Sequence, residues 1–105
     1  MNNNLTYSLI RHTVDASLPG TRILLFGSHA RGDNDRASDY DLLIITPGKY
    51  TAKEKINWLG QLNRSLVHAI NAPVDLLMDS EADILIKGQL PGHIIQTALK
   101  EGIAI

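Results

Sequence analysis

Cysteine is absent from the chain, which excludes disulfide bonds, cysteine nucleophiles and zinc sites built on thiolates. Charge of one sign is not in excess either, because ten basic and eleven acidic residues leave a net charge of −1. Non-specific nucleic-acid binding requires a basic surface that neutralises phosphates, so direct nucleic-acid binding is not expected. No apolar run approaches the about 20 residues that cross a membrane. The polar residues 1–4 lack the pattern of a signal peptide. These absences favour a small cytoplasmic domain without membrane contact.

The composition that remains is typical of one folded domain. The length of 105 residues fits a single domain over residues 1–105, and 44% apolar residues are enough for a core. The predicted helices cover residues 4–17, 29–31, 52–70, 80–88 and 91–100, and the predicted strands cover residues 22–26, 39–46, 74–78 and 103–105. This order predicts an α/β (α+β) domain with a small mixed sheet and helices mainly on one face.

The helix predicted to end near residue 70 carries the clearest start signal. Thr51 and Glu54 fit a capping box, in which each side chain binds the other's backbone N–H. Asn63 lies inside its apolar stripe and does not fit an apolar face. Trp58 lies at the edge of the stripe, where it either packs against the core or faces a partner. The stripe consists of Ala52, Ile56, Leu59, Leu62, Leu66 and Ile70.

A glycine-containing turn follows the first predicted strand. Gly27 and Ser28 come directly after the apolar residues 22–26 and before a short helix. Free backbone N–H groups at such a turn bind anions, and glycine lets a phosphate approach closely. The P-loop is excluded, because its second glycine is followed by Lys and then Ser or Thr, whereas Asp33 and Asn34 stand here.

Three aspartates lie on the two strands predicted after this turn. Asp39 and Asp41 are two residues apart, so both carboxylates share one face of the strand. Asp75 joins that face if its strand pairs beside theirs. Neighbouring carboxylates repel one another unless a cation lies between them, and ligand sets made only of oxygen favour Mg²⁺ or Mn²⁺. Carboxylates near a phosphate-binding turn indicate metal-assisted phosphoryl or nucleotidyl transfer.

The combination of these segments is specific. Residues 27–32 read Gly-Ser-His-Ala-Arg-Gly, residues 38–42 read Ser-Asp-Tyr-Asp-Leu, and a lone Asp follows in a later strand. The pattern resembles the DNA polymerase β-type nucleotidyltransferase superfamily, and the length is similar to that of its minimal nucleotidyltransferase (MNT) branch. The resemblance covers residues 22–78 at the level of motifs and implies a nucleotidyltransferase fold like the polymerase β palm.

The resemblance also implies residue roles. In that family the Gly-Ser turn holds a nucleoside triphosphate, here ATP, and the aspartate pair binds two Mg²⁺ ions. The third carboxylate completes the metal site and helps to deprotonate the acceptor. The implied nucleotide-binding residues are Gly27, Ser28 and Arg31, with Arg31 shaping the turn, and the implied catalytic and metal-binding residues are Asp39, Asp41 and Asp75.

Finally, the resemblance implies a partner. MNT proteins pair with a small helical HEPN protein, an RNase-type toxin, in a hetero-oligomer, and members transfer AMP from ATP onto a tyrosine of that toxin. This predicts an antitoxin that adenylylates its toxin. Two alternatives stay open: an antitoxin that acts by contact alone, and a stand-alone adenylyltransferase for a small-molecule acceptor.

Overall fold

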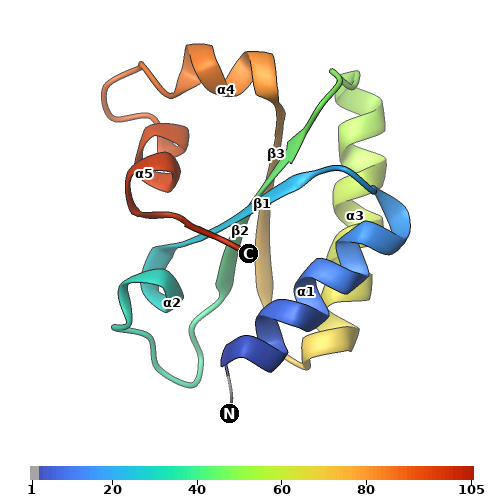
Figure 1. The fold of residues 1–105 in the computed structure, drawn as a ribbon, viewed down its shortest axis with the longest axis vertical. Helices are drawn as coiled ribbons and strands as arrows, with labels where there is room; N and C mark the ends of the chain where they lie inside the picture. Colours follow the sequence, from blue (N-terminus) through green and yellow to red (C-terminus); the bar gives the residue numbers. More distant parts are fainter. Residues whose placement is uncertain (1–2) are drawn as a thin grey trace.

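A computed structural model describes residues 3–105 of the chain. Its elements follow the predicted order, and Figure 1 shows them arranged around a central sheet. The helices are α1 (Asn3–Ser17), α2 (Gly27–Arg31), α3 (Ala52–Ile70), α4 (Glu81–Lys87) and α5 (Ile94–Glu101). The strands are β1 (Arg22–Phe26), β2 (Tyr40–Thr46), β3 (Val74–Ser80) and β4 (Ile103–Ala104).

Three boundaries differ from the prediction by two residues or more. Helix α2 begins directly at Gly27 rather than at residue 29. Strand β3 continues past residue 78 to Ser80, because parallel pairing with β2 extends that far. Helix α5 begins after His93 rather than at Pro91, because the His93 ring accepts the Ile95 N–H at 3.0 Å and caps the helix there.

The sheet is mixed, with the strand order β3-β2-β1-β4. Strands β2 and β3 are parallel and are joined through α3, whereas β1 runs antiparallel to both β2 and β4. The end of β1 therefore lies beside the beginnings of β2 and β3. In that register Phe26 pairs with Asp41, and Asp41 pairs with Asp75. The expected small mixed sheet is confirmed, and its topology brings the predicted turn and carboxylates to one edge.

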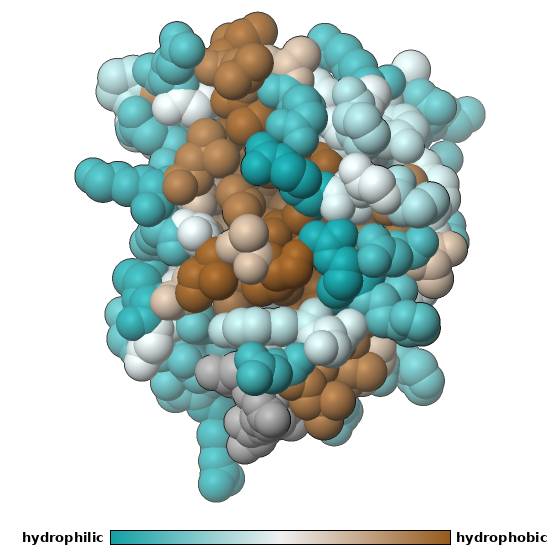
Figure 2. Space-filling model, viewed as in Figure 1, coloured by the Kyte–Doolittle hydropathy of each residue, from teal (hydrophilic) through white to brown (hydrophobic). Residues whose placement is uncertain are grey.

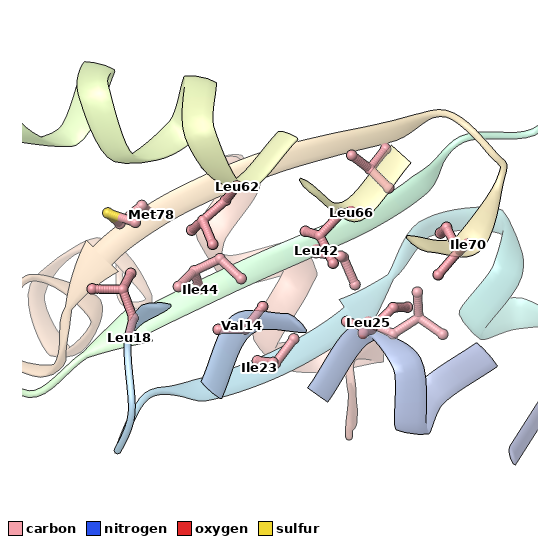
Figure 3. Close-up of a cluster of buried hydrophobic side chains, with 12 residues drawn as sticks. Val14, Leu18, Ile23, Leu25, Leu42, Ile44, Leu62, Leu66, Ile70 and Met78 are labelled. Carbon is pink, nitrogen blue, oxygen red and sulfur yellow. The ribbon is translucent and has the colours of Figure 1, made fainter. Parts of the chain in front are cut away.

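Helices cover both faces of this sheet. Helices α1 and α3 cover one face, and the shorter α4 and α5 pack on the other (Figure 1). Figure 3 shows the larger core, in which buried side chains of α1 and α3 meet alternate residues of the strands. The smaller core consists of Leu24, Phe26, Leu43, Ile45, Ile84, Ile95 and Ala98. The two longest helices, α1 and α3, lie on one face of the sheet, as predicted. The structure adds a second, smaller layer of helices, α4 and α5, on the opposite face.

Helix α3 shows how the sequence sets its orientation. The predicted capping box is present, because Thr51 and Glu54 exchange side chain-to-backbone hydrogen bonds. Asn63 is compatible with the core side, since its amide donates to the Val74 carbonyl at 3.2 Å. Ala52 and Ile56 were expected in the buried stripe but are exposed, Ile56 at 70%. Ile56 lies about 120° around the helix from the buried Leu62, on the flank of the face that meets the core. Half-buried Trp58 packs against the larger core.

Apolar side chains also gather on the surface. Figure 2 shows them in a band over α4 and the region of α5 and β4. The exposed members on these elements and their connection are Leu85, Ile86, Leu90, Ile94, Leu99 and Ile103. No helix within residues 3–105 has the length and apolar character needed to cross a membrane.

Candidate functional site

The turn between β1 and α2 is built around Gly27. Its φ of +74° lies in the left-handed region that favours glycine. A Cβ atom at this position would overlap the carboxylate of Asp41. Glycine is therefore required here by both backbone conformation and space, and the turn lies directly against the first part of β2.

The C-terminal end of the short helix α2 is capped by backbone hydrogen bonds. The Ser28 carbonyl accepts the N–H groups of Gly32 and Asp33 at 2.9 and 3.1 Å. Gly32 ends the helix with a φ of +83°, again in the left-handed region. Arg31 is 49% exposed and places its guanidinium between two carboxylates, with Asp33 at 3.1 Å and Glu101 at 3.2 Å. Arg31 thus links the turn to α5.

The three predicted carboxylates lie at the same edge of the sheet. Asp41 and Asp75 are register partners on parallel strands, and Asp39 comes two residues before Asp41. Burial raises the pKa of the Asp41 carboxyl above its ordinary value, and the negative charges of Asp75 and Asp39 raise it further. The His29 ring and Arg31 oppose that shift. The raised pKa means that ionised Asp41 is disfavoured where no cation is bound.

The chemistry of this donor set fits Mg²⁺, which prefers carboxylate oxygens and retains contacts to water and to phosphates. Asp39 and Asp75 are exposed and Asp41 is half-buried, so their oxygens are accessible. Among residues 3–105 no three acidic or histidine side chains are already arranged closely enough to hold a metal ion. Mg²⁺ in phosphoryl-transfer sites usually takes further oxygens from the substrate phosphates, so the donor types present are compatible with such a site.

Glu101 belongs to this site, although the sequence motifs did not point to it. Its carboxylate accepts the backbone N–H of Gly27 at 2.8 Å and binds Arg31. It comes from the last residue of α5, 74 residues from the turn. No local spacing relates the two positions, and only the tertiary packing of α5 against β1 reveals the contact.

The ring of His29 is held by residues at the start of β2 and just before it. Its ring stacks on Tyr40 with centroids 3.7 Å apart, and Nε2 lies 3.0 Å from the Ser38 carbonyl oxygen. These contacts attach the exposed loop after α2 to the start of β2. A pocket of about 860 Å³ opens beside this loop, and none of the three aspartates lines it. Its lining residues are Tyr7, His29, Gly32, Asn34, Asp35, Arg36, Ser38, Tyr40 and Ala72.

Comparison with known sequences identifies relatives of this chain. A family profile described as "Nucleotidyltransferase domain" matches residues 8–105. A Methanocaldococcus jannaschii protein named "Putative protein adenylyltransferase" is 56% identical over 34 residues, which are 32% of this chain and 34% of that protein. That match therefore spans about a third of the relative's length.

Comparison with solved structures identifies the same fold. A chain from a toxin–antitoxin complex with AMP-PNP superposes with a TM-score of 0.68 at 21% identity, covering 92% of this chain and 69% of the other. A structure described as "putative minimal nucleotidyltransferase" also has a TM-score of 0.68 at 21% identity, covering 100% and 97% of the two chains. A third is a Shewanella oneidensis complex of a tri-AMPylated HEPN toxin with an MNT antitoxin. Its TM-score is 0.60 at 18% identity, covering 98% of this chain and 71% of that one.

Proposed function

This chain belongs to the nucleotidyltransferase domain family, and from that premise we propose that it is an Mg²⁺-dependent adenylyltransferase that uses ATP. One observation carries the proposal. The parallel register of β2 and β3 pairs Asp41 with Asp75, while Gly27 of the turn lies against the Asp41 carboxylate. The proposed phosphate-binding turn and the proposed metal ligands thus lie at one edge of the sheet, which supports a shared site for one triphosphate.

The proposed roles follow from this arrangement. The N–H groups at Gly27 and Ser28 bind the phosphates, since they lie at a turn that begins a helix. Asp39, Asp41 and Asp75 are the residues that hold Mg²⁺, which when bound neutralises phosphate charge and orients the reacting groups. Asp75 is more exposed than its register partner Asp41. It accepts the proton of the acceptor hydroxyl.

The bond changes balance without a further reactant. The acceptor hydroxyl oxygen forms a bond to the α-phosphorus of ATP, and the bond from that phosphorus to the bridging oxygen breaks. Pyrophosphate leaves with the electron pair, and AMP remains on the acceptor. Negative charge develops on the phosphate oxygens during this step, next to the positively charged Arg31.

We further propose that the acceptor is a helical toxin of the HEPN class and that this chain is its antitoxin. The support is the likeness of fold to chains of toxin–antitoxin complexes, one of which contains a tri-AMPylated HEPN toxin and an MNT antitoxin. The M. jannaschii relative carries the name of a protein adenylyltransferase. A toxin tyrosine is the expected acceptor, because the motif resemblance implies one.

The test is an adenylylation assay with ATP labelled at the α-phosphorus, Mg²⁺, and a purified HEPN-class toxin as the candidate partner. We expect the label on the partner, and we expect Asp39→Asn with Asp41→Asn to reduce labelling by at least about 100-fold. Asp15→Asn is the matched control, because Asp15 forms an exposed ion pair with Arg11 on α1.

The outcomes separate the alternatives. Full protection from the toxin by the double variant would replace this proposal with neutralisation by contact alone. Label on an added small hydroxylated acceptor but never on the partner would identify a stand-alone transferase. Loss of labelling with retained co-purification of the partner is the result expected for a catalytic antitoxin.

A further inference from the structure

The Glu101 carboxylate accepts a hydrogen bond from the backbone N–H of Gly27, a donor that a bound phosphate would also use. Glu101 Oε1 accepts the Gly27 N–H at 2.8 Å, and the same carboxylate receives Arg31 Nη1 at 3.2 and 3.3 Å. We propose that Glu101 is a placeholder for the nucleotide phosphates, which satisfies the turn in the free enzyme and is displaced when nucleotide binds. This inference rests on the proposed nucleotide-binding function.

The competition follows from the donors involved. The Gly27 N–H carries a single proton, and at 2.8 Å from a carboxylate that proton is already in a charge-assisted hydrogen bond. Arg31 is the neighbouring cation, and it also faces the Glu101 carboxylate. A triphosphate placed on the same groups would meet the negative charge of Glu101 at close range. Both anions therefore cannot use the turn together.

The packing of α5 indicates how Glu101 leaves. Ile95 and Ala98 are buried against the sheet and hold α5 in place. At Gly102, a Cβ would overlap the Ala98 carbonyl and lie 3.3 Å from the Leu24 Cβ, so the backbone after Glu101 is closely packed. The Glu101 side chain is 23% exposed and has solvent on one side. Displacement by rotation of this side chain, with α5 fixed, is the simplest route.

The experiment measures binding of Mg²⁺–AMP-PNP and of Mg²⁺–tripolyphosphate by calorimetry. We expect Glu101→Ala to bind both about 5–20-fold more tightly than the wild type, because no internal carboxylate has to be displaced. Glu101→Gln keeps the shape of the side chain and a weaker acceptor for the Gly27 N–H, but it loses the ion pair with Arg31. Its affinity for both ligands should therefore increase less than that of Glu101→Ala. It also provides a second variant in case the alanine protein folds poorly. Tripolyphosphate tests the phosphates without the nucleoside.

Asp33→Ala is the matched control, because Asp33 also binds Arg31, at 3.1 Å, but does not contact the Gly27 N–H. We expect its affinity to change by less than about 2-fold. An equal gain in Asp33→Ala would overturn the placeholder role and assign the effect to Arg31 alone. Unchanged or weaker binding in both Glu101 variants, with a binding wild type, would overturn it and leave the proposed function standing. Binding by none of the proteins would overturn both.

Discussion

At the scale of single residues, the site could be predicted where its chemistry is local in sequence. Gly27 was identified because it directly follows a strand, and Asp41 because it lies near the start of the next strand, two residues from a second aspartate. The structure adds that the two are in contact. Glu101 could not be predicted, because its role depends on where α5 docks and not on any neighbour in sequence. The roles of the aspartates in catalysis stay predictions until activity is measured.

The raised pKa of Asp41 leads to a prediction about stability. A carboxyl with a raised pKa in the folded state binds its proton more tightly there, so ionised Asp41 destabilises the fold above that pKa. The cost disappears as the pH falls below the unfolded value of about 3.9. We expect Asp41→Asn to raise Tm at pH 7 in EDTA by about 2–5 °C, with the difference shrinking towards acid pH.

Thermal unfolding followed by circular dichroism between pH 3.5 and 8 measures this effect. Asp15→Asn is the control, since Asp15 lies far from the site in an exposed ion pair. A lower Tm for Asp41→Asn at pH 7 would show that the carboxylate stabilises the fold instead. Activity should be lost in either case.

At the scale of elements, burial was predicted well in the middle of a helix, where the apolar spacing repeats, and less well in its first turns. The capping box and the buried positions Leu62, Leu66 and Ile70 of α3 were predicted because helical periodicity and caps are local. Ala52 and Ile56 were placed in the buried stripe because periodicity alone does not show which flank of the stripe meets the core. Asn63 disturbed the apolar pattern because its partner, the Val74 carbonyl, lies on the following strand.

Asn63 therefore offers a test of how α3 is attached to β3. Asn63→Ala leaves the Val74 carbonyl without this donor, which costs about 1–2 kcal/mol, and alanine's helix propensity offsets roughly 0.5 of it. We expect the free energy of unfolding, measured with urea, to fall by about 1 kcal/mol. Asn57→Ala, at an exposed position of the same helix, should change it by less than about 0.5 kcal/mol. Equal effects in the two variants would contradict a specific link to β3.

At the scale of the whole molecule, the mixed sheet determines where the site lies. The antiparallel β1 ends where the parallel β2 and β3 begin, so turn and carboxylates share one edge. The sequence predicted the strands but not their order, because strand pairing depends on contacts between distant segments. The presence of α4 and α5 on the second face was likewise not foreseen, and this layer carries both Glu101 and the exposed apolar band (Figure 2).

The apolar band leads to a prediction about the proposed partner. Clusters of exposed apolar side chains on a small protein usually belong to an interface. Leu85 and Ile86 are 70% and 65% exposed on α4, in the layer whose α5 reaches the turn at Gly27. We expect Leu85→Ser with Ile86→Ser to weaken binding of the helical toxin at least about 10-fold, with AMP-PNP binding unchanged.

Calorimetry or co-purification with the toxin measures this association. Ile56→Ser is the matched control, because Ile56 is equally exposed, at 70%, but lies on α3. Loss of binding in Ile56→Ser and not in the α4 double variant would locate the interface on the α3 side instead.

The contact between Gly27 and Asp41 also bears on how such a chain can diverge. Position 27 is held by two independent requirements, a left-handed backbone and the space taken up by the Asp41 carboxylate. Asparagine and aspartate tolerate the first but not the second. In a lineage that abandons catalysis, position 41 can drift to a smaller residue at once, whereas position 27 becomes free to drift only afterwards. The two losses therefore have an order imposed by geometry, and decayed descendants should have replaced the aspartate before the glycine.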